Sequence, residues 1–126
     1  MRKLIALIAF LSFASIASAQ VVIQEQDINK MEEVKYVKLL GIQKAFSSKI
    51  IINIDYGQKF QMFKPQMIQG PDGKNKDFNS LIEALNFMDA NGWEYVNSYP
   101  LSTGNSGTVY HYLLKRKDEN TKVASN

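Results

Sequence analysis

The stretch from Phe78 to Tyr99 constrains the fold most strongly, because it predicts a helix, a helix stop and a strand in direct succession. Ser80 and Glu83 have the spacing of a capping box, in which the serine hydroxyl accepts from the Glu83 N–H and the Glu83 carboxylate reaches back to the Ser80 N–H. Four apolar residues then recur on one helical face: Leu81, Ala84, Leu85 and Met88. The predicted helix has about three turns, too few to be stable alone in water, so it must pack on a sheet.

Gly92 follows this helix at the position where a left-handed residue commonly ends one. With Gly92 there, Trp93 and Met88 become the pair that touches across a Schellman motif. We therefore predict a positive φ at Gly92 and place Trp93 in the core beneath the helix.

Alternating apolar residues predict the strands. The clearest run is Lys49 to Tyr56, in which every second residue should face the helix: Ile50, Ile52, Ile54 and Tyr56. The other predicted strands are Val34 to Leu40, Lys59 to Phe63, the exit strand that Val96 to Tyr99 complete, and Thr108 to Lys115. A turn at Gly70-Pro71-Asp72-Gly73 favours a small two-stranded flap. This order predicts an α+β fold, with an antiparallel sheet of about four to five strands and one helix packed on one face.

The N-terminal residues have the three parts of a secretory signal peptide. Met1-Arg2-Lys3 is positively charged, Leu4 to Phe13 is almost wholly apolar, and Ala17-Ser18-Ala19 is a small-x-small cleavage site before Gln20. The apolar run is too short to span a membrane. We expect residues 1–19 to be removed and the mature chain to be exported, to the periplasm or the cell exterior, without a membrane span.

The mature chain is long enough for one domain with one core. We expect residues 20–33 to form a loose polar N-terminal arm, residues 34–116 a single α+β domain, and the polar residues 117–126 a disordered tail.

Charge and cysteine content exclude several functions. Arg2 and Lys3 leave with the leader, so 15 basic residues become 13 against 12 acidic ones, and the net charge falls from +3 to +1. Nucleic acid is therefore not an expected partner, because a phosphate-binding surface needs clustered surplus charge. The one basic cluster, Lys115-Arg116-Lys117, is followed by Asp118-Glu119 and is interpreted as a solvated strand end. The chain has no cysteine, which excludes disulfides, thiolate metal sites and a lipid-anchored cleavage site.

The last third of the chain carries a recognisable pattern: Ala84-Leu85-Asn86, then Gly92-Trp93-Glu94, then a strand ending Leu113-Leu114-Lys115-Arg116. This pattern resembles a family of small bacterial domains of unknown function, numbered 4177. The run from Ile52 to Gln58 is similar to one in exported Bacteroidetes proteins that carry the same C-terminal pattern. The resemblance implies a fold and no catalytic residues, and this chain has a longer N-terminal half than the minimal domain.

The residues offer little support for catalysis. His111 is the single histidine and falls in the middle of a predicted strand, and there is no Gly-x-Ser-x-Gly nucleophile elbow. Asp55, Asp89 and Glu94 are carboxylates of the kind that any small protein offers. We therefore expect no catalytic, cofactor-binding or metal-binding residues, and no cofactor.

Aromatic residues crowd the last two predicted strands. Alternation would place Tyr95 and Tyr99 on one side of the sheet, and Tyr110 and Tyr112 on one side. Two interpretations remain open for these four tyrosines. They can be ordinary sheet packing, or they can form a partner surface for an unknown protein, peptide or glycan.

The sheet face away from the helix is predicted to be mixed, since Ile51 shares it with Asn53 and Asp55. Such a face suits a monomer or a weak homodimer, because permanent interfaces resemble a core cut in half. We therefore expect a small exported, non-catalytic binding or accessory module. The alternative is a structural domain that dimerises through its open sheet face, and a small enzyme is the third interpretation.

Overall fold

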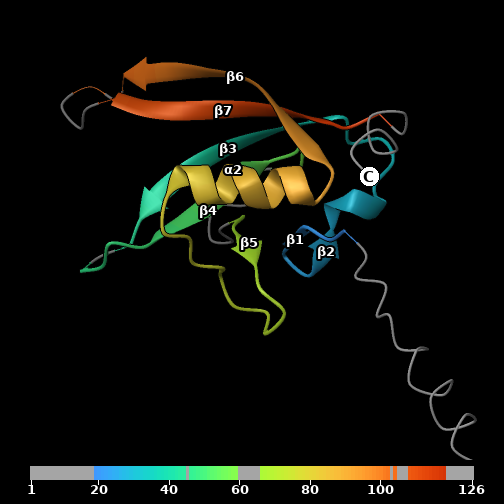
Figure 1. Cartoon of the computed structure of the whole chain (residues 1–126), viewed down its shortest axis with the longest axis horizontal. Helices are drawn as coiled ribbons and strands as arrows, with labels where there is room; N and C mark the ends of the chain where they lie inside the picture. Colours follow the sequence, from blue (N-terminus) through green and yellow to red (C-terminus); the bar gives the residue numbers. More distant parts are fainter. Residues whose placement is uncertain (1–18, 45, 60–65, 103, 105–107, 119–126) are drawn as a thin grey trace, which may run out of the picture.

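The computed structural model describes residues 19–44, 46–59, 66–102, 104 and 108–118 (Figure 1). Its larger sheet is antiparallel and four-stranded, in the order β4-β3-β7-β6. The strands are β3 (Tyr36–Gln43), β4 (Ile50–Asp55), β6 (Trp93–Ser102) and β7 (Thr108–Arg116). Helix α2 (Leu81–Ala90) lies against one face of this sheet. The predicted α+β fold with one helix on an antiparallel sheet is therefore confirmed.

A second, smaller sheet lies on the same side of the larger sheet as α2 (Figure 1). It has the order β2-β1-β5, from β1 (Val22–Ile23), β2 (Gln26–Asp27) and β5 (Ile68–Gln69). A 3-10 turn, η1 (Ile28–Lys30), connects it to β3. We call the side of the larger sheet that carries α2 and the small sheet the inner face, and the opposite side the outer face.

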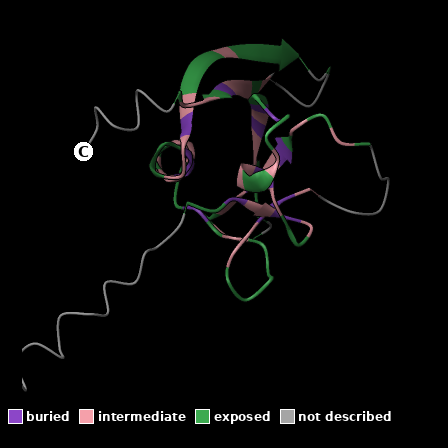
Figure 2. Cartoon of the chain, turned by 90° about the vertical axis from the view of Figure 1, so that its right-hand side faces the viewer, coloured by how far each residue is buried: buried purple, intermediate pink, exposed green. Residues whose placement is uncertain are grey.

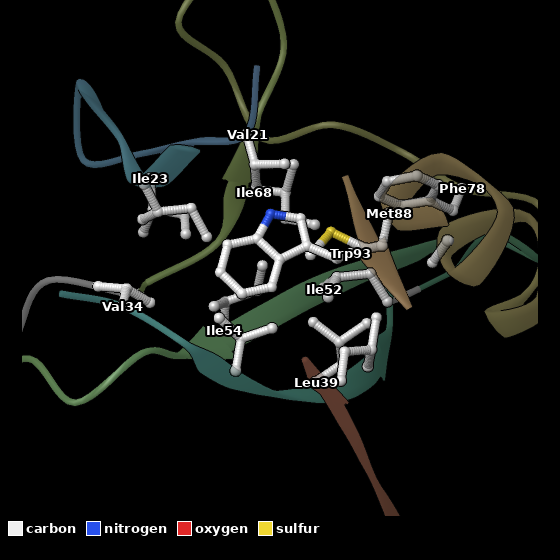
Figure 3. Packing of buried hydrophobic residues seen from close by; sticks show 14 residues of the cluster. Val21, Ile23, Val34, Leu39, Ile52, Ile54, Ile68, Phe78, Met88 and Trp93 are labelled. Carbon is white, nitrogen blue, oxygen red and sulfur yellow. The ribbon is translucent and has the colours of Figure 1, made fainter. Parts of the chain in front are cut away.

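The core lies between the inner face, α2 and the small sheet (Figures 2 and 3). Strand alternation supplies one half of it, because alternate residues of β3, β4 and β7 point inward: Val37, Leu39, Ile52, Ile54 and Leu114. Trp93 lies at the centre with none of its surface exposed, beside Met88. Both the burial of Trp93 and its place beside Met88 agree with the prediction.

The helix begins and ends where the sequence predicts. Ser80 is its N-cap, and the Ser80 hydroxyl accepts from the Glu83 N–H at 3.1 Å. The Glu83 carboxylate accepts instead from the N–H of Asn79, at 2.9 Å, so the return bond of the predicted capping box reaches one residue further back. Gly92 has φ +93°, the left-handed conformation predicted for the helix stop.

The expectation of a loose arm at residues 20–33 is wrong. Val21, Ile23 and Ile28 have no exposed surface and belong to the main core. The two-residue strands β1 and β2 are too short to show any periodicity in the sequence, so their burial depends on tertiary contacts. The small sheet is therefore part of the domain.

Strand β3 is displaced from the predicted range, since it begins at Tyr36 and continues through Gly41 to Gln43. The turn at residues 70–73 forms as predicted, with the Gly73 N–H donating to the Gly70 carbonyl at 3.0 Å. A bridge between Gln69 and Asn75 makes the two-stranded flap.

Several predictions fall outside the described residues. They are the leader up to residue 18, most of the strand predicted at 59–63, and the tail from residue 119. Within the described part of the chain, none of the helices has the length and apolar character needed to cross a membrane.

Candidate functional site

The outer face of the larger sheet lies on the side away from α2 and the small sheet (Figure 1). Pairing across the sheet places on it positions 36, 38, 40 and 42 of β3, 51, 53 and 55 of β4, 109, 111, 113 and 115 of β7, and 94, 97, 99 and 101 of β6. None of these described side chains is buried. The predicted placement of Ile51, Asn53 and Asp55 opposite the helix agrees with this register.

The charges of the outer face lie at one end and are paired within it. Lys38 Nζ is 3.3 Å from the Asp55 carboxylate, and Lys115 Nζ is 3.1 Å from that of Glu94. The bond to Glu94 and its negative charge raise the pKa of Lys115. Because two positive and two negative groups are paired locally, the face carries no surplus of either sign.

The opposite end of the outer face is apolar. Ile42 pairs with Ile51, and Leu101 pairs with Val109 on the neighbouring hairpin. Ile42 and Leu101 expose 38% and 46% of their surface. We call these four residues the apolar end.

His111 lies between the two ends, paired with Leu40 on one side and Tyr99 on the other. Its ring stacks on that of Tyr99, with 5.3 Å between centroids and 11° between planes. Burial, and then the positive charge of Lys38, lower the pKa of His111, so the imidazole is neutral near pH 7.

One ring nitrogen of His111 is unpaired among the described residues. Its Nδ1 atom is buried and has no hydrogen-bond partner among the described residues. A histidine base is commonly oriented by a carboxylate or carbonyl at this nitrogen. Among the described residues no such group bonds this nitrogen, and the stacking partner of the ring is Tyr99.

The four candidate tyrosines do not form one platform. Tyr95 pairs with Leu114 on the inner face, whereas Tyr99 pairs with His111 on the outer face. A β-bulge between Tyr95 and Asn97 inserts one extra residue and reverses the alternation. The expectation that Tyr95 and Tyr99 share a side is therefore wrong.

Tyr110 and Tyr112 do share a side, which is the inner face. Tyr112 packs against the core and lies 6.4 Å from Tyr95, measured between ring centroids. The Tyr95 hydroxyl donates to Ser98 Oγ at 3.0 Å. Tyr95 and Tyr110 remain about half exposed, at 51% and 53%. Tyr99, at 38%, is the one candidate tyrosine on the outer face.

The strand edges offer poorer docking than the face. On the β6 edge the Ser98 N–H donates to the Asn97 side chain at 2.8 Å, and Pro100 has no N–H to donate. On the β4 edge, bridges to Met67 and Phe78 occupy Asn53 and Ile50. Proline, bulges and covering segments are the usual means by which proteins block pairing at sheet edges.

A cluster of hydrogen bonds that sequence reasoning missed centres on Arg116. Its guanidinium donates to the carbonyls of η1 and the following loop at 2.9–3.1 Å: Val34, Asn29, Ile28 and Met31. The interpretation of Lys115-Arg116-Lys117 as a solvated strand end is therefore wrong for Arg116. The available signal was alternation, since Arg116 follows the buried Leu114 on the inner face.

The remaining structural candidates lie as expected. Trp93 also donates from Nε1 to the Asn29 side chain, at 2.7 Å, and Leu85 packs against the core from α2. Within the described ranges no group of three or more His, Asp and Glu side chains could hold a metal ion.

No family model, curated protein or solved structure matches this chain. The resemblance to the family numbered 4177 therefore stays a prediction.

Proposed function

We propose that the chain is exported and acts as a non-catalytic binding or accessory module, holding a partner protein on the outer face of its larger sheet. The observation that carries this proposal is the composition of that face. It combines an apolar end and the exposed Tyr99 with charges that are already paired to one another.

The dimensions of the face favour brief rather than permanent binding. Three strand spacings of about 4.8 Å and six residues at about 3.4 Å give roughly 14 Å by 20 Å. The resulting area of roughly 280 Å² is smaller than the roughly 800 Å² that each partner buries in a standard stable interface. A partner held here would exchange readily, as suits an accessory module.

The paired charges indicate the kind of partner. With no surplus charge on the face, long-range steering of a strongly acidic or basic molecule is weak. An uncharged, partly apolar protein surface is the best match. A free peptide that adds a strand is a poorer one, because both sheet edges are obstructed.

Photo-crosslinking tests the proposal with a matched pair of positions. A benzophenone amino acid replaces Tyr99 in one variant and Tyr110 in the other, and both are expressed in the native host and irradiated. The two tyrosines lie on neighbouring strands and on opposite faces. We expect a discrete higher-mass adduct from position 99 and none from position 110.

The outcomes separate the alternatives. An adduct from position 110 alone would move the partner surface to the inner-face tyrosines, and no adduct from either would contradict the proposal. Variants found only in the unprocessed, intracellular form would contradict export. If the proposal holds, we expect mass spectrometry of the adduct to identify a protein other than this chain.

Self-association through the same face is a second candidate, favoured by the same balance of charge. A surface without surplus charge does not repel a second copy of itself. Light scattering over a concentration series would show a weak dimer. Leu101→Lys would weaken it by bringing a charge into the apolar end of the contact, whereas Ile82→Lys on the exposed side of α2 would leave it unchanged.

A further inference from the structure

The residue that follows the predicted cleavage site is hydrogen-bonded to the helical end of the domain. The backbone nitrogen of Gln20 donates to the side-chain oxygen of Asn91 at 3.0 Å. The next residue, Val21, has no exposed surface, and its N–H donates to the Asp27 carboxylate at 3.2 Å. The first residue of the predicted mature chain is therefore already attached to the domain.

Asn91 is held in an orientation that presents its oxygen to Gln20. It is the C-cap of α2, and its side-chain nitrogen donates to the Phe87 carbonyl at 2.7 Å. Its backbone carbonyl accepts from the Asn29 side chain at 2.8 Å. With the amide nitrogen engaged in the helix, the amide oxygen is the atom left to accept from the chain terminus.

We infer that the α-ammonium group created by leader removal binds Asn91 Oδ1 and stabilises the processed domain relative to its precursor. This inference rests on the proposed export. Hydrolysis of the Ala19–Gln20 peptide bond adds one water, leaves a carboxylate on Ala19 and frees the Gln20 amine. That amine takes up a proton at neutral pH, because an α-amino group has a pKa of about 7.7–8.0.

Two physical effects make the ammonium a better donor than the peptide N–H that it replaces. A hydrogen bond from a charged donor is stronger than a neutral one. The C-terminal end of a helix also carries partial negative charge, which attracts a cation. The same helix end holds Lys117, whose Nζ is already paired with Asp89 at 2.9 Å, so its repulsion of a second cation is reduced.

A paired measurement of stability tests the inference on the mature chain, Gln20 to Asn126. Both samples carry Gln20→Ala, which keeps the backbone nitrogen and removes the side-chain amide that could form a lactam. One sample has a free amine and the other an N-acetyl group, which retains one N–H but no charge. We expect acetylation to raise the unfolding equilibrium constant roughly two- to fivefold at pH 6.5.

Asn91 variants show whether the effect arises at the proposed site. In Asn91→Ala the difference between free and acetylated chains should shrink to the part that the helix end alone contributes, and in Asn91→Asp it should grow because an ion pair forms. Equal stabilities of the two samples without an Asn91 change would overturn the inference. A difference that is the same in Asn91→Ala and in Asn91→Asp would also overturn it.

Mass spectrometry of the exported protein separates this inference from the proposal of export. A mass that begins at Gln20 with its amine intact agrees with both. A mass lower by one ammonia would show that the amine has attacked its own side-chain amide to form a neutral lactam, which overturns the inference while export stands. A chain that still carries residues 1–19 would contradict export, and the stability pair would still decide the role of Asn91.

Discussion

The guanidinium carbon of Arg116 lies 4.7 Å from the centre of the Trp93 ring. Trp93 and Arg116 are paired across β6 and β7 at the end of the hairpin. The indole packs in the core, while the guanidinium donates hydrogen bonds to carbonyls of η1 and the loop that follows it. This contact therefore joins the larger sheet, the helix stop and the N-terminal segment at one point.

Replacing Arg116 by lysine should cost about 2–4 kcal/mol of unfolding free energy. Lysine cannot reproduce the planar fork, so carbonyls that Arg116 now satisfies would lose their donors. Urea denaturation measures the change. Lys115→Ala is the matched control, because Lys115 is an exposed neighbour whose solvent-screened ion pair with Glu94 should contribute little to stability. Equal costs for the two variants would contradict the role of Arg116.

Truncating the indole, with Trp93→Ala, should cost about 3–5 kcal/mol, because it leaves a cavity at the centre of the core. Trp93→Phe keeps most of the volume and should cost less, while leaving Asn29 without its donor. Thermal unfolding of the two variants gives the order. A melt that scarcely moves for Trp93→Ala would show that the ring is not a core residue.

The helix stop should be sensitive to a side chain at Gly92. Gly92→Ala places a Cβ in the left-handed region at φ +93° and should destabilise by roughly 1–2 kcal/mol. Asn86→Ala, at an exposed site on α2, should leave stability unchanged or slightly higher. Differential scanning calorimetry of both variants tests this, and a loss only in the control would be inconsistent with the left-handed stop.

The position of Gly41 has no room for a side chain, because Leu81 packs directly over it. A Cβ at Gly41 would be 2.7 Å from Leu81 Cδ2 and 3.2 Å from Leu81 Cγ. Gly41→Ala should therefore destabilise by about 1 kcal/mol, since the leucine can shift in part. In a Leu81→Ala background the same change should cost nothing. Additive losses in this double-mutant cycle would show that the two sites are independent.

Stability should depend on pH through His111. Its pKa in the folded chain is lowered by burial and by Lys38, so the unfolded chain binds the proton more readily. The contribution of the neutral imidazole is fully present above the unfolded pKa of about 6.5 and is lost as pH falls through the lower folded value. His111→Gln should flatten the dependence in that range. Denaturation curves between pH 7.5 and pH 5 would show this, and parallel profiles for both proteins would contradict it.

Native tyrosine labelling should follow the two faces. Iodination should modify Tyr36, Tyr95, Tyr99 and Tyr110, which are 38–60% exposed, before the partly buried Tyr112. A partner or second copy on the outer face should protect Tyr36 and Tyr99 and leave Tyr110 reactive. Peptide mapping by mass spectrometry gives the sites, and protection of Tyr110 alone would place the contact on the inner face.

The helix and its two ends could be predicted because their signals are local. The Ser80 cap, the apolar stripe and Gly92 all act within a few residues of chain. The inward set of β4 followed from strict alternation, as Ile52 and Ile54 show. Neither the helix boundaries nor the inward-facing residues of β4 depend on how a strand is aligned with its neighbour.

The features that sequence reasoning missed depend on distant contacts. Val21 and Ile28 are buried by strands and a helix that lie far along the chain, and the sequence around them shows no apolar periodicity that would indicate it. The acceptors of Arg116 are backbone carbonyls, which have no signature in the sequence. The bulge before Asn97 likewise arises from fitting β6 to β7, so Tyr99 could not be assigned to its face by counting residues.

That bulge divides β6 into two halves that are subject to different constraints. Trp93 and Tyr95 lie on the inner face, whereas Tyr99 and Leu101 face outward, where Tyr99 stacks on His111 outside the core. Substitutions in the second half can therefore accumulate with little loss of folding. A lineage, or a protein engineer, could diversify this half-strand to acquire new recognition while the other half keeps the domain intact.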